Sequence, residues 1–329
     1  MTTYYETYGQ KVQYLASDPT DVQIGQVWYN STSDTLKVRT VSTVGSWASG
    51  GTMNTARISL GGNGIKTAAL AFGGGGAGTT ELYNGTSWTS NPTGLNTARN
   101  NMGSAGTQTS GLAFGGTVGS PNTYQSASES FNGSSWTATP SINTARYNVG
   151  NGTGIQTAAI YSGGYNNSNL TNVENWNGST WTSGTSYPTA LRDYMLVGTQ
   201  TAALGAGGYP TFTTGASFNG TSWTATPSLA TPTAALGGFG TQTAAIGAGG
   251  YSPAGPSYTT TATQIWNGTT WSSNPTGLAA AKTAMGSSKT SPSSSGVIFG
   301  GRTNPASPSS STEEWTGAGV GQTNTVTVT

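Results

Sequence analysis

The chain lacks cysteine and histidine altogether, and charged residues make up 6% of it, against about 25% in ordinary globular proteins. Without cysteine it has no disulfide framework, thiolate metal site or cysteine nucleophile. Without histidine it lacks the commonest general base and the commonest transition-metal ligand. Carboxylates are also scarce, so we expect a protein that is not an enzyme and holds no cofactor or metal ion.

The near absence of net charge excludes further classes. The formal net charge is +1, and no cluster of lysine and arginine offers a field for nucleic acid or an anionic membrane surface. No apolar run approaches the roughly 20 residues that span a bilayer. The first ten residues, "MTTYYETYGQ", lack the basic and apolar regions of a signal peptide. We therefore expect no nucleic-acid partner, no membrane insertion and no secretion signal.

Glycine and aromatic residues are abundant instead. The 329 residues include 51 glycines, 10 tryptophans, 15 tyrosines and 7 phenylalanines. The aromatic side chains supply enough apolar area to bury, which argues against disorder.

One pattern occurs six times along the chain. An apolar run ends in a glycine pair, then come an aromatic residue and a turn (Asn-Gly in five of the six). In the first five repeats a tryptophan follows the turn, and the sixth repeat lacks it. The pairs are Gly73-Gly74, Gly115-Gly116, Gly163-Gly164, Gly207-Gly208, Gly249-Gly250 and Gly300-Gly301. The tryptophans are Trp88, Trp136, Trp181, Trp223 and Trp271, and Trp47 stands alone before the first pair. A period of roughly 40–50 residues with several short strands indicates a β-propeller.

Each repeat is interpreted as four strands, with the third and fourth joined at Asn-Gly by a two-residue type I′ turn. We predict an all-β fold, a six-bladed propeller over 44–329 with a short N-terminal β segment over 1–43. The blades are expected near 52–91, 96–140, 143–184, 189–227, 231–274 and 279–322. Residues 44–50 would supply the outer strand of the last blade, although the tail "TNTVTVT" (323–329) is an alternative for that place.

Two resemblances follow from these residues. The order of apolar run, Gly-Gly, loop, Glu-x-Tyr, turn and Trp over roughly 45–320 resembles the kelch repeat of β-propellers. The hairpin-like segment "VQIGQVWYNSTSDTLKVRT" (22–40) is similar to segments of tailed-bacteriophage virion proteins, especially tail fibres and related appendages. The second resemblance implies a virion component that is made in the host cytoplasm, with residues 1–43 attached to other virion proteins.

Three sequence motifs could indicate a binding or modification site, but we interpret each of them as structural. Gly73, Gly75 and Gly78 fit G-x-G-x-x-G, but a hairpin rather than a helix follows, so a phosphate site is not expected. The five N-G-[ST] sequons coincide with hairpin turns. The "NG[TS][ST]W" motif is similar to the Asp-box of six-bladed sialidases, but it lacks the aspartate and no matching carboxylate set accompanies it. A galactose-oxidase type of copper site needs the absent histidine and cysteine.

Cations and acids recur at fixed places in the repeats. The cations, at the head of the first strand, are Arg57, Arg99, Arg146, Arg192 and Lys282, with Pro232 in the fifth repeat. The acids, at the head of the third strand, are Glu81, Glu129, Glu174 and Glu313, with Ala216 and Gln264 in repeats four and five. Glycine at the end of the second strand would leave room for each cation to cross to its acid and clamp three strands. The alternative is that these side chains are direct ligands for a sugar.

The loops between the second and third strands vary most and carry aromatic residues. These are Tyr124, Tyr165, Tyr209, Phe212, Tyr251 and Tyr258. Variable loops on a rigid scaffold often carry recognition, and exposed aromatics bind sugars or proteins; the other interpretation is that they cover the blade tops. We expect a non-enzymatic phage virion protein that binds a host surface glycan or another virion protein. The alternatives are a soluble multivalent lectin and, less favoured, a sialidase-type enzyme.

Overall fold

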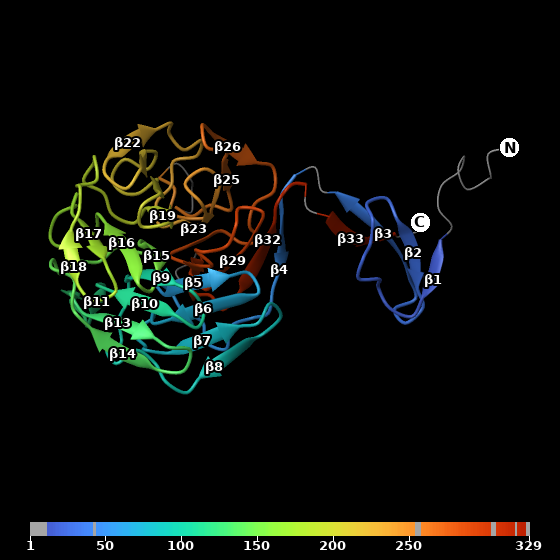
Figure 1. Cartoon of the computed structure of the whole chain (residues 1–329), viewed down its shortest axis with the longest axis horizontal. Helices are drawn as coiled ribbons and strands as arrows, with labels where there is room; N and C mark the ends of the chain where they lie inside the picture. Colours follow the sequence, from blue (N-terminus) through green and yellow to red (C-terminus); the bar gives the residue numbers. More distant parts are fainter. Residues whose placement is uncertain (1–11, 42–43, 254–257, 304–306, 320, 327–329) are drawn as a thin grey trace. The chain divides into compact units, whose positions relative to one another are not determined.

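The computed structural model describes residues 12–41, 44–253, 258–303, 307–319 and 321–326. Over these residues the chain is all-β (Figure 1), and it has no helix that is long and apolar enough to cross a membrane. The chain divides into two units, one of residues 1–45 with 316–329 and the other Ser46–Trp315. The propeller was predicted to extend to residue 329. The unit ends at Trp315 instead, and residues 316–329 belong with the N-terminal unit.

The unit Ser46–Trp315 consists mainly of six four-stranded antiparallel sheets, numbered here in chain order and set around a common centre (Figure 1). Sheets 1 to 3 contain β5 (Gly61–Ile65), β6 (Ala68–Phe72), β7 (Thr80–Tyr83) and β8 (Trp88–Asn91); β9 (Gly103–Gly106), β10 (Gly111–Phe114), β13 (Ser128–Phe131) and β14 (Trp136–Thr139); and β15 (Thr153–Ile155), β16 (Ala158–Ser162), β17 (Val173–Trp176) and β18 (Trp181–Ser183). Sheets 4 and 5 contain β19 (Met195–Gly198), β20 (Ala203–Ala206), β21 (Gly215–Phe218) and β22 (Trp223–Thr226); and β23 (Gly237–Gly240), β24 (Ala245–Ala248), β25 (Thr263–Trp266) and β26 (Trp271–Asn274). This is a β-propeller-like all-β architecture.

Sheet 6 takes its strands from both ends of the unit. Its order is β28 (Gly286–Ser287), β29 (Ser295–Phe299), β32 (Thr312–Thr316) and β4 (Ser46–Ser49). Residues 46–49 therefore form the outer strand of this sheet, for which both residues 44–50 and the tail were candidates from the sequence. The other candidate, the tail, forms β33 (Gly321–Thr325), which pairs with β3 (Thr35–Val41) in the N-terminal unit.

The Asn-Gly hairpin turns are longer than predicted. In sheet 1, Tyr83 pairs with Trp88, so the loop has four residues, 84–87, rather than two. Gly85 has a φ of +92°, but Asn84 is not in the left-handed region, so the turn is not type I′. The Asn84 side-chain oxygen instead accepts the backbone N–H groups of Thr86 (2.9 Å) and Ser87 (2.8 Å). The Asn84 amide group thus stabilises a four-residue loop, whereas the preference of Asn-Gly for type I′ turns predicts a two-residue loop.

Aromatic side chains fill the space between neighbouring sheets. Trp136 of sheet 2 packs against Phe72 of sheet 1, with ring centroids 4.8 Å apart. Trp88 of sheet 1 packs in the same way against Phe299 of sheet 6, also at 4.8 Å. Trp47 of β4 contacts Phe239 of sheet 5 and donates its indole N–H to Thr263 (2.8 Å). The repeated tryptophan thus joins each of these sheets to the one before it.

The glycine pairs lie at the junction between each sheet and the next one. Gly73 and Gly74 have φ values of +60° and +83°, which L side chains rarely adopt. A Cβ on Gly73 would lie 2.8 Å from the Arg99 carbonyl oxygen of sheet 2, and one on Gly74 would lie 2.6 Å from the Ile58 oxygen. The second glycine of every pair donates its N–H to the next repeat, and Gly301 donates to Arg57 of the first repeat at 2.8 Å. In sheet 1 the groups that a Cβ would meet belong to backbone and apolar side chains, whereas in sheet 3 a Cβ on Gly164 would also lie 3.2 Å from Cδ of Arg146. The expectation that glycine leaves room for the arginine is therefore met in sheet 3 and not in sheet 1.

A second ring of hydrogen bonds surrounds the centre of the unit. Residues 59, 101, 148, 193, 235 and 284 each donate a backbone N–H to the preceding member, and Ser59 donates to Ala284 at 2.9 Å. At Asp193 the acceptor is the Asn148 side-chain oxygen; elsewhere it is a backbone carbonyl. Five members, all except residue 148, have φ between +51° and +57°. We call these six residues the central ring.

The N-terminal unit contains a four-stranded sheet in the order β1 (Gln13–Leu15), β2 (Val27–Asn30), β3 and β33. Strands β2 and β3 form the hairpin expected around "NSTSD", and β1 pairs parallel to β2. Buried Trp28 donates to Asp18 (3.0 Å), whose carboxylate also binds Lys37 (2.7 Å) and Asn30 (2.7 Å). These contacts, the Lys37 bond first, lower the pKa of Asp18 to about 2.

Candidate functional site

Four of the predicted cation–acid combinations are ion pairs. Arg57–Glu81 (2.9 Å), Arg99–Glu129 (2.8 Å), Arg146–Glu174 and Lys282–Glu313 (2.8 Å) join within sheets 1, 2, 3 and 6. Every partner is at most 4% exposed. The cations stand ahead of the first strands, which begin four to seven residues later. Each pair therefore fixes a connecting segment to the third strand.

The paired side chains also bind neighbouring backbone groups, as the first pair shows. The Arg57 guanidinium also donates to the carbonyl oxygens of Gly73 (2.9 Å) and Thr79 (2.7 Å). The second oxygen of Glu81 accepts the Asn54 N–H at 2.7 Å. Burial lowers the pKa of the Arg57 guanidinium and Glu81 opposes that shift. Because these side chains are buried and paired with one another, they favour the clamp interpretation over the ligand interpretation.

Two of the predicted cation positions were assigned to the wrong residue. In sheet 4 the equivalent position is Leu191, which is buried, as is Ala216 at the acid position. Arg192 stands one residue later, where sheet 3 has Tyr147, as their matching bridges to Tyr209 and Tyr165 show. In sheet 5 the position belongs to Thr233, whose hydroxyl accepts a hydrogen bond from Gln264 (3.2 Å), and not to Pro232. A neutral or apolar pair fills the same buried space, which the pattern of charges alone did not reveal.

Displaced from the clamp position, Arg192 lies between two aromatic rings. Its guanidinium carbon is 4.6 Å from the centroid of Tyr165 and 4.2 Å from that of Tyr209, a cation–π geometry. It also donates to Asn169 (2.8 Å) and pairs with Asp193 (3.5 Å).

The six predicted aromatic residues and one further tyrosine form a continuous series of contacts, which we call the aromatic arc. Its members in order are Tyr124, Tyr147, Tyr165, Tyr209, Phe212, Tyr251 and Tyr258. Successive ring centroids lie 5.5–6.1 Å apart, except where Arg192 bridges Tyr165 and Tyr209. Tyr209 and Tyr258 are 41% and 57% exposed. The arc spans the variable loops of sheets 2 to 5.

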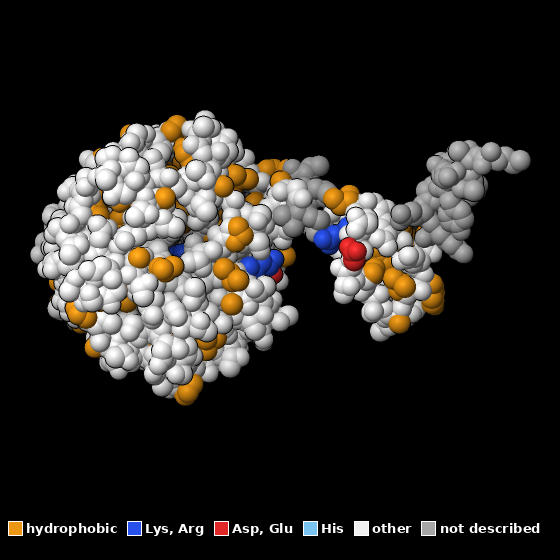
Figure 2. Space-filling model, in the orientation of Figure 1, with side chains coloured by type: hydrophobic (Ala, Val, Ile, Leu, Met, Phe, Trp, Pro, Cys, Tyr) orange, Lys and Arg blue, Asp and Glu red, His pale blue; other side chains and the backbone are white. Residues whose placement is uncertain are grey.

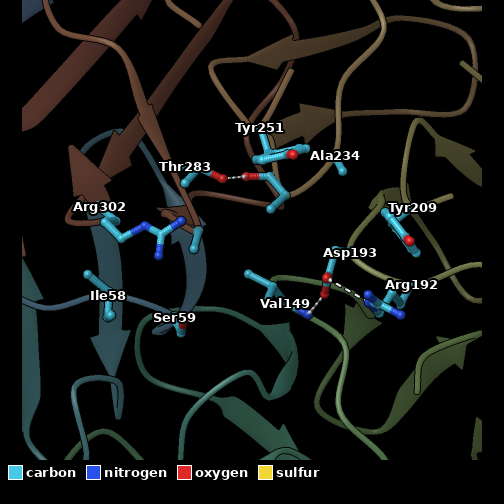
Figure 3. A pocket seen from close by; sticks show the side chains of 12 residues that line it. Ile58, Ser59, Val149, Arg192, Asp193, Tyr209, Ala234, Tyr251, Thr283 and Arg302 are labelled. Carbon is cyan, nitrogen blue, oxygen red and sulfur yellow. Dashed lines mark hydrogen bonds and ion pairs between the residues drawn. The ribbon is translucent and has the colours of Figure 1, made fainter. Parts of the chain in front are cut away.

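A cavity of about 360 Å³ adjoins the arc at the centre of the unit (Figure 3). Central-ring residues, Tyr209, Tyr251 and two arginines line it. Figure 3 shows Arg302 entering from one side, with Asp193 and Arg192 on the other. Arg302 is exposed and forms no ion pair with a described carboxylate. We call this space the central cavity.

The electrostatics of the central cavity depend on Asp193. Burial raises the pKa of its carboxyl, while the Val149 N–H (3.1 Å) and Arg192 oppose that shift. Burial also raises the pKa of the nearby Tyr147 hydroxyl to about 12. The cavity therefore offers hydrogen-bonding groups and one positive charge beyond its internal ion pair, but no pair of carboxylates placed for acid–base chemistry.

Sequence reasoning missed Tyr147, Asp193 and Arg302. The first two lie one and two residues after the clamp position of their repeats. Asp193 is a member of the central ring, and Tyr147 directly precedes Asn148, another member of that ring. Arg302 directly follows the last glycine pair. It was missed because the sixth repeat matches the pattern of the others poorly.

A second cavity, of about 660 Å³, lies among the loops between first and second strands, at the other end of those strands. Lys289 lines it and is 3% exposed. Its ammonium donates to the carbonyl oxygens of Gly152 (2.8 Å) and Ser104 (3.3 Å). Burial lowers the pKa of this lysine to about 7.

No protein-family model matches the chain, and no curated protein matches it significantly. The site is therefore interpreted from its own geometry.

Proposed function

We propose that residues 46–315 form a closed, six-bladed propeller of kelch-like type that binds a surface glycan through the aromatic arc. Closure is supported by the contact of β28 with β5, by β4 in sheet 6 and by the two circular sets of hydrogen bonds. The aromatic arc carries the functional proposal.

Sugar rings present apolar C–H faces that pack on aromatic side chains, and hydroxyls that suit a polar, uncharged surface. The arc provides several such faces side by side, and Tyr209 and Tyr258 expose theirs to solvent. The surrounding surface has few charges, as Figure 2 shows for one face. Repeated weak contacts along a polysaccharide would add up through avidity.

We further propose that the protein is a non-enzymatic component of a phage particle, with the N-terminal unit attached to other virion proteins. The support is the resemblance of residues 22–40 to phage appendage segments and the exposure of Tyr14 (75%) and Ile24 (66%) in that unit. Capsid or tail genes beside the coding gene, and the protein in purified particles, would separate this role from that of a free lectin.

The glycan proposal is tested with purified full-length chain on an array of bacterial surface polysaccharides. We expect the double variant Tyr209→Ala/Tyr258→Ala to lose at least tenfold in apparent affinity, because it removes the two most exposed stacking surfaces. Tyr14→Ala, which removes a more exposed tyrosine (75%) from the other unit, is the control and should bind as the unchanged chain does. Equal binding by all three proteins, or binding by none, contradicts the proposal.

A further inference from the structure

The central cavity has an unusual balance of charge for so neutral a protein. Two guanidinium groups, Arg192 and Arg302, and one carboxylate, Asp193, line it. Arg192 and Asp193 pair with each other at 3.5 Å. One positive charge, that of Arg302, therefore remains without a carboxylate partner among the described residues.

The position of Arg302 indicates a ligand more than a structural role. The buried cations Arg57, Arg99, Arg146 and Lys282 each have a glutamate, whereas the Arg302 side chain is exposed and extends into the cavity (Figure 3). A free guanidinium holds its donors in a planar fork that fits a carboxylate with two parallel hydrogen bonds.

The walls on either side complete a site for a small polar ring. Tyr209 and Tyr251 contribute aromatic surface, and Ile58, Ala234 and Ala284 contribute apolar surface. Asp193 lies across from Arg302 and can accept hydrogen bonds from hydroxyl groups (Figure 3). The volume of about 360 Å³ falls at the small end of ligand pockets and suits one sugar residue.

The floor of the cavity is held in place before any ligand arrives. Ser59, Asp193, Ala235 and Ala284 belong to the central ring, whose hydrogen bonds run from sheet to sheet. A site built on such a ring loses little conformational freedom on binding.

We propose that the central cavity binds one acidic sugar of the glycan, with its carboxylate on Arg302 and its hydroxyls facing Asp193. The proposal rests on the proposed glycan function and assigns it a substrate class, polysaccharides that contain uronic or related sugar acids. Two guanidinium groups against one carboxylate leave a single positive charge, which matches one carboxylate better than a phosphate dianion.

The experiment compares an acidic polysaccharide that binds on the array with the same polysaccharide after chemical reduction of its carboxyl groups. We expect the reduced form to bind at least tenfold more weakly. Arg302→Gln should bind both forms alike, at the level that the unchanged chain shows for the reduced form. Arg39→Gln, the same change in the N-terminal unit, should keep the preference, and the thermal midpoints of both variants should match that of the unchanged chain.

Other outcomes are distinct. Equal binding of both forms by the unchanged chain overturns the assignment of an acidic sugar and leaves the glycan proposal standing. A preference that survives in Arg302→Gln overturns the role of Arg302. Binding of neither form by any variant overturns the glycan proposal itself. Stronger binding of a phosphorylated glycan than of any carboxylated one identifies the anion as phosphate and contradicts the proposal.

Discussion

Lys289 is a buried cation whose partners are backbone carbonyls rather than a carboxylate. Burial lowers its pKa from 10.5 to about 7. Between pH 7 and 10.5 the unfolded chain therefore binds a proton that the folded chain does not, and stability rises with pH across that window. Below pH 7 Lys289 is protonated in both states, and the folded state then carries the full cost of burying its charge.

The chain is well suited to testing this effect, because it has no histidine or cysteine to titrate in the same range. We expect the free energy of unfolding in urea to rise by roughly 2–3 kcal/mol from pH 7 to pH 9. Lys289→Met should abolish most of that rise, while Lys66→Met should keep it. An equal rise in all three proteins would show that Lys289 does not cause it.

The ion pair of Arg99 and Glu129 gives a second prediction at this scale. Removing the cation alone, as in Arg99→Leu, leaves a buried carboxylate without its charge partner and should cost about 3 kcal/mol. Sheet 4 already fills the same positions with Leu191 and Ala216. The double variant Arg99→Leu/Glu129→Ala should therefore lose much less than the sum of the two single changes.

Chemical denaturation of the double-mutant cycle measures the coupling. A coupling energy near zero would mean that the pair does not act as a clamp. The pair Leu191→Ala and Ala216→Gly is the matched control, because it lacks charges and should show only the coupling expected of packed apolar side chains.

At the scale of elements, the order of strands was predictable and several of their contacts were not. The period of the tryptophans and the alternation of apolar residues placed β6, β7 and β8 within a residue or two, because both signals come from burial. Strand β4 was foreseen from Trp47, which has no other place in the pattern. The first strands begin later than expected, because the residues around Arg57 form a connecting segment bridged to Ser309.

Only those residues of the candidate site that recur at a fixed place in the repeat were predictable from the sequence. The six loop aromatics stood out because the loops vary between repeats. Their union into one arc depends on the displaced Arg192, which bridges Tyr165 and Tyr209. The central cavity depends on contacts between distant parts of the chain, because residues 58, 193 and 302 line it together. Such long-range contacts leave no local signal, so a single sequence does not reveal them.

At the scale of the whole molecule, the chain starts and ends in one unit and builds the other between. Strand β33 joins β3 across almost the full length of the sequence, and β4 and β32 leave the second unit as neighbouring strands of sheet 6. The N-terminal unit therefore needs the end of the chain for its sheet, whereas the unit Ser46–Trp315 does not.

A chain that ends at Gly317 separates the two. Without β33, β3 becomes an unpaired edge, and we expect hydrogen exchange of segment 27–41 to accelerate at least tenfold, because its backbone bonds to 321–325 are lost. Exchange of segment 61–72 in sheet 1 should be unchanged. A chain that ends at Val326 keeps β33 whole and is the matched control. If loss of β33 also exposed the amides of sheet 1, the two units would unfold together and the division between them would be wrong as a thermodynamic statement.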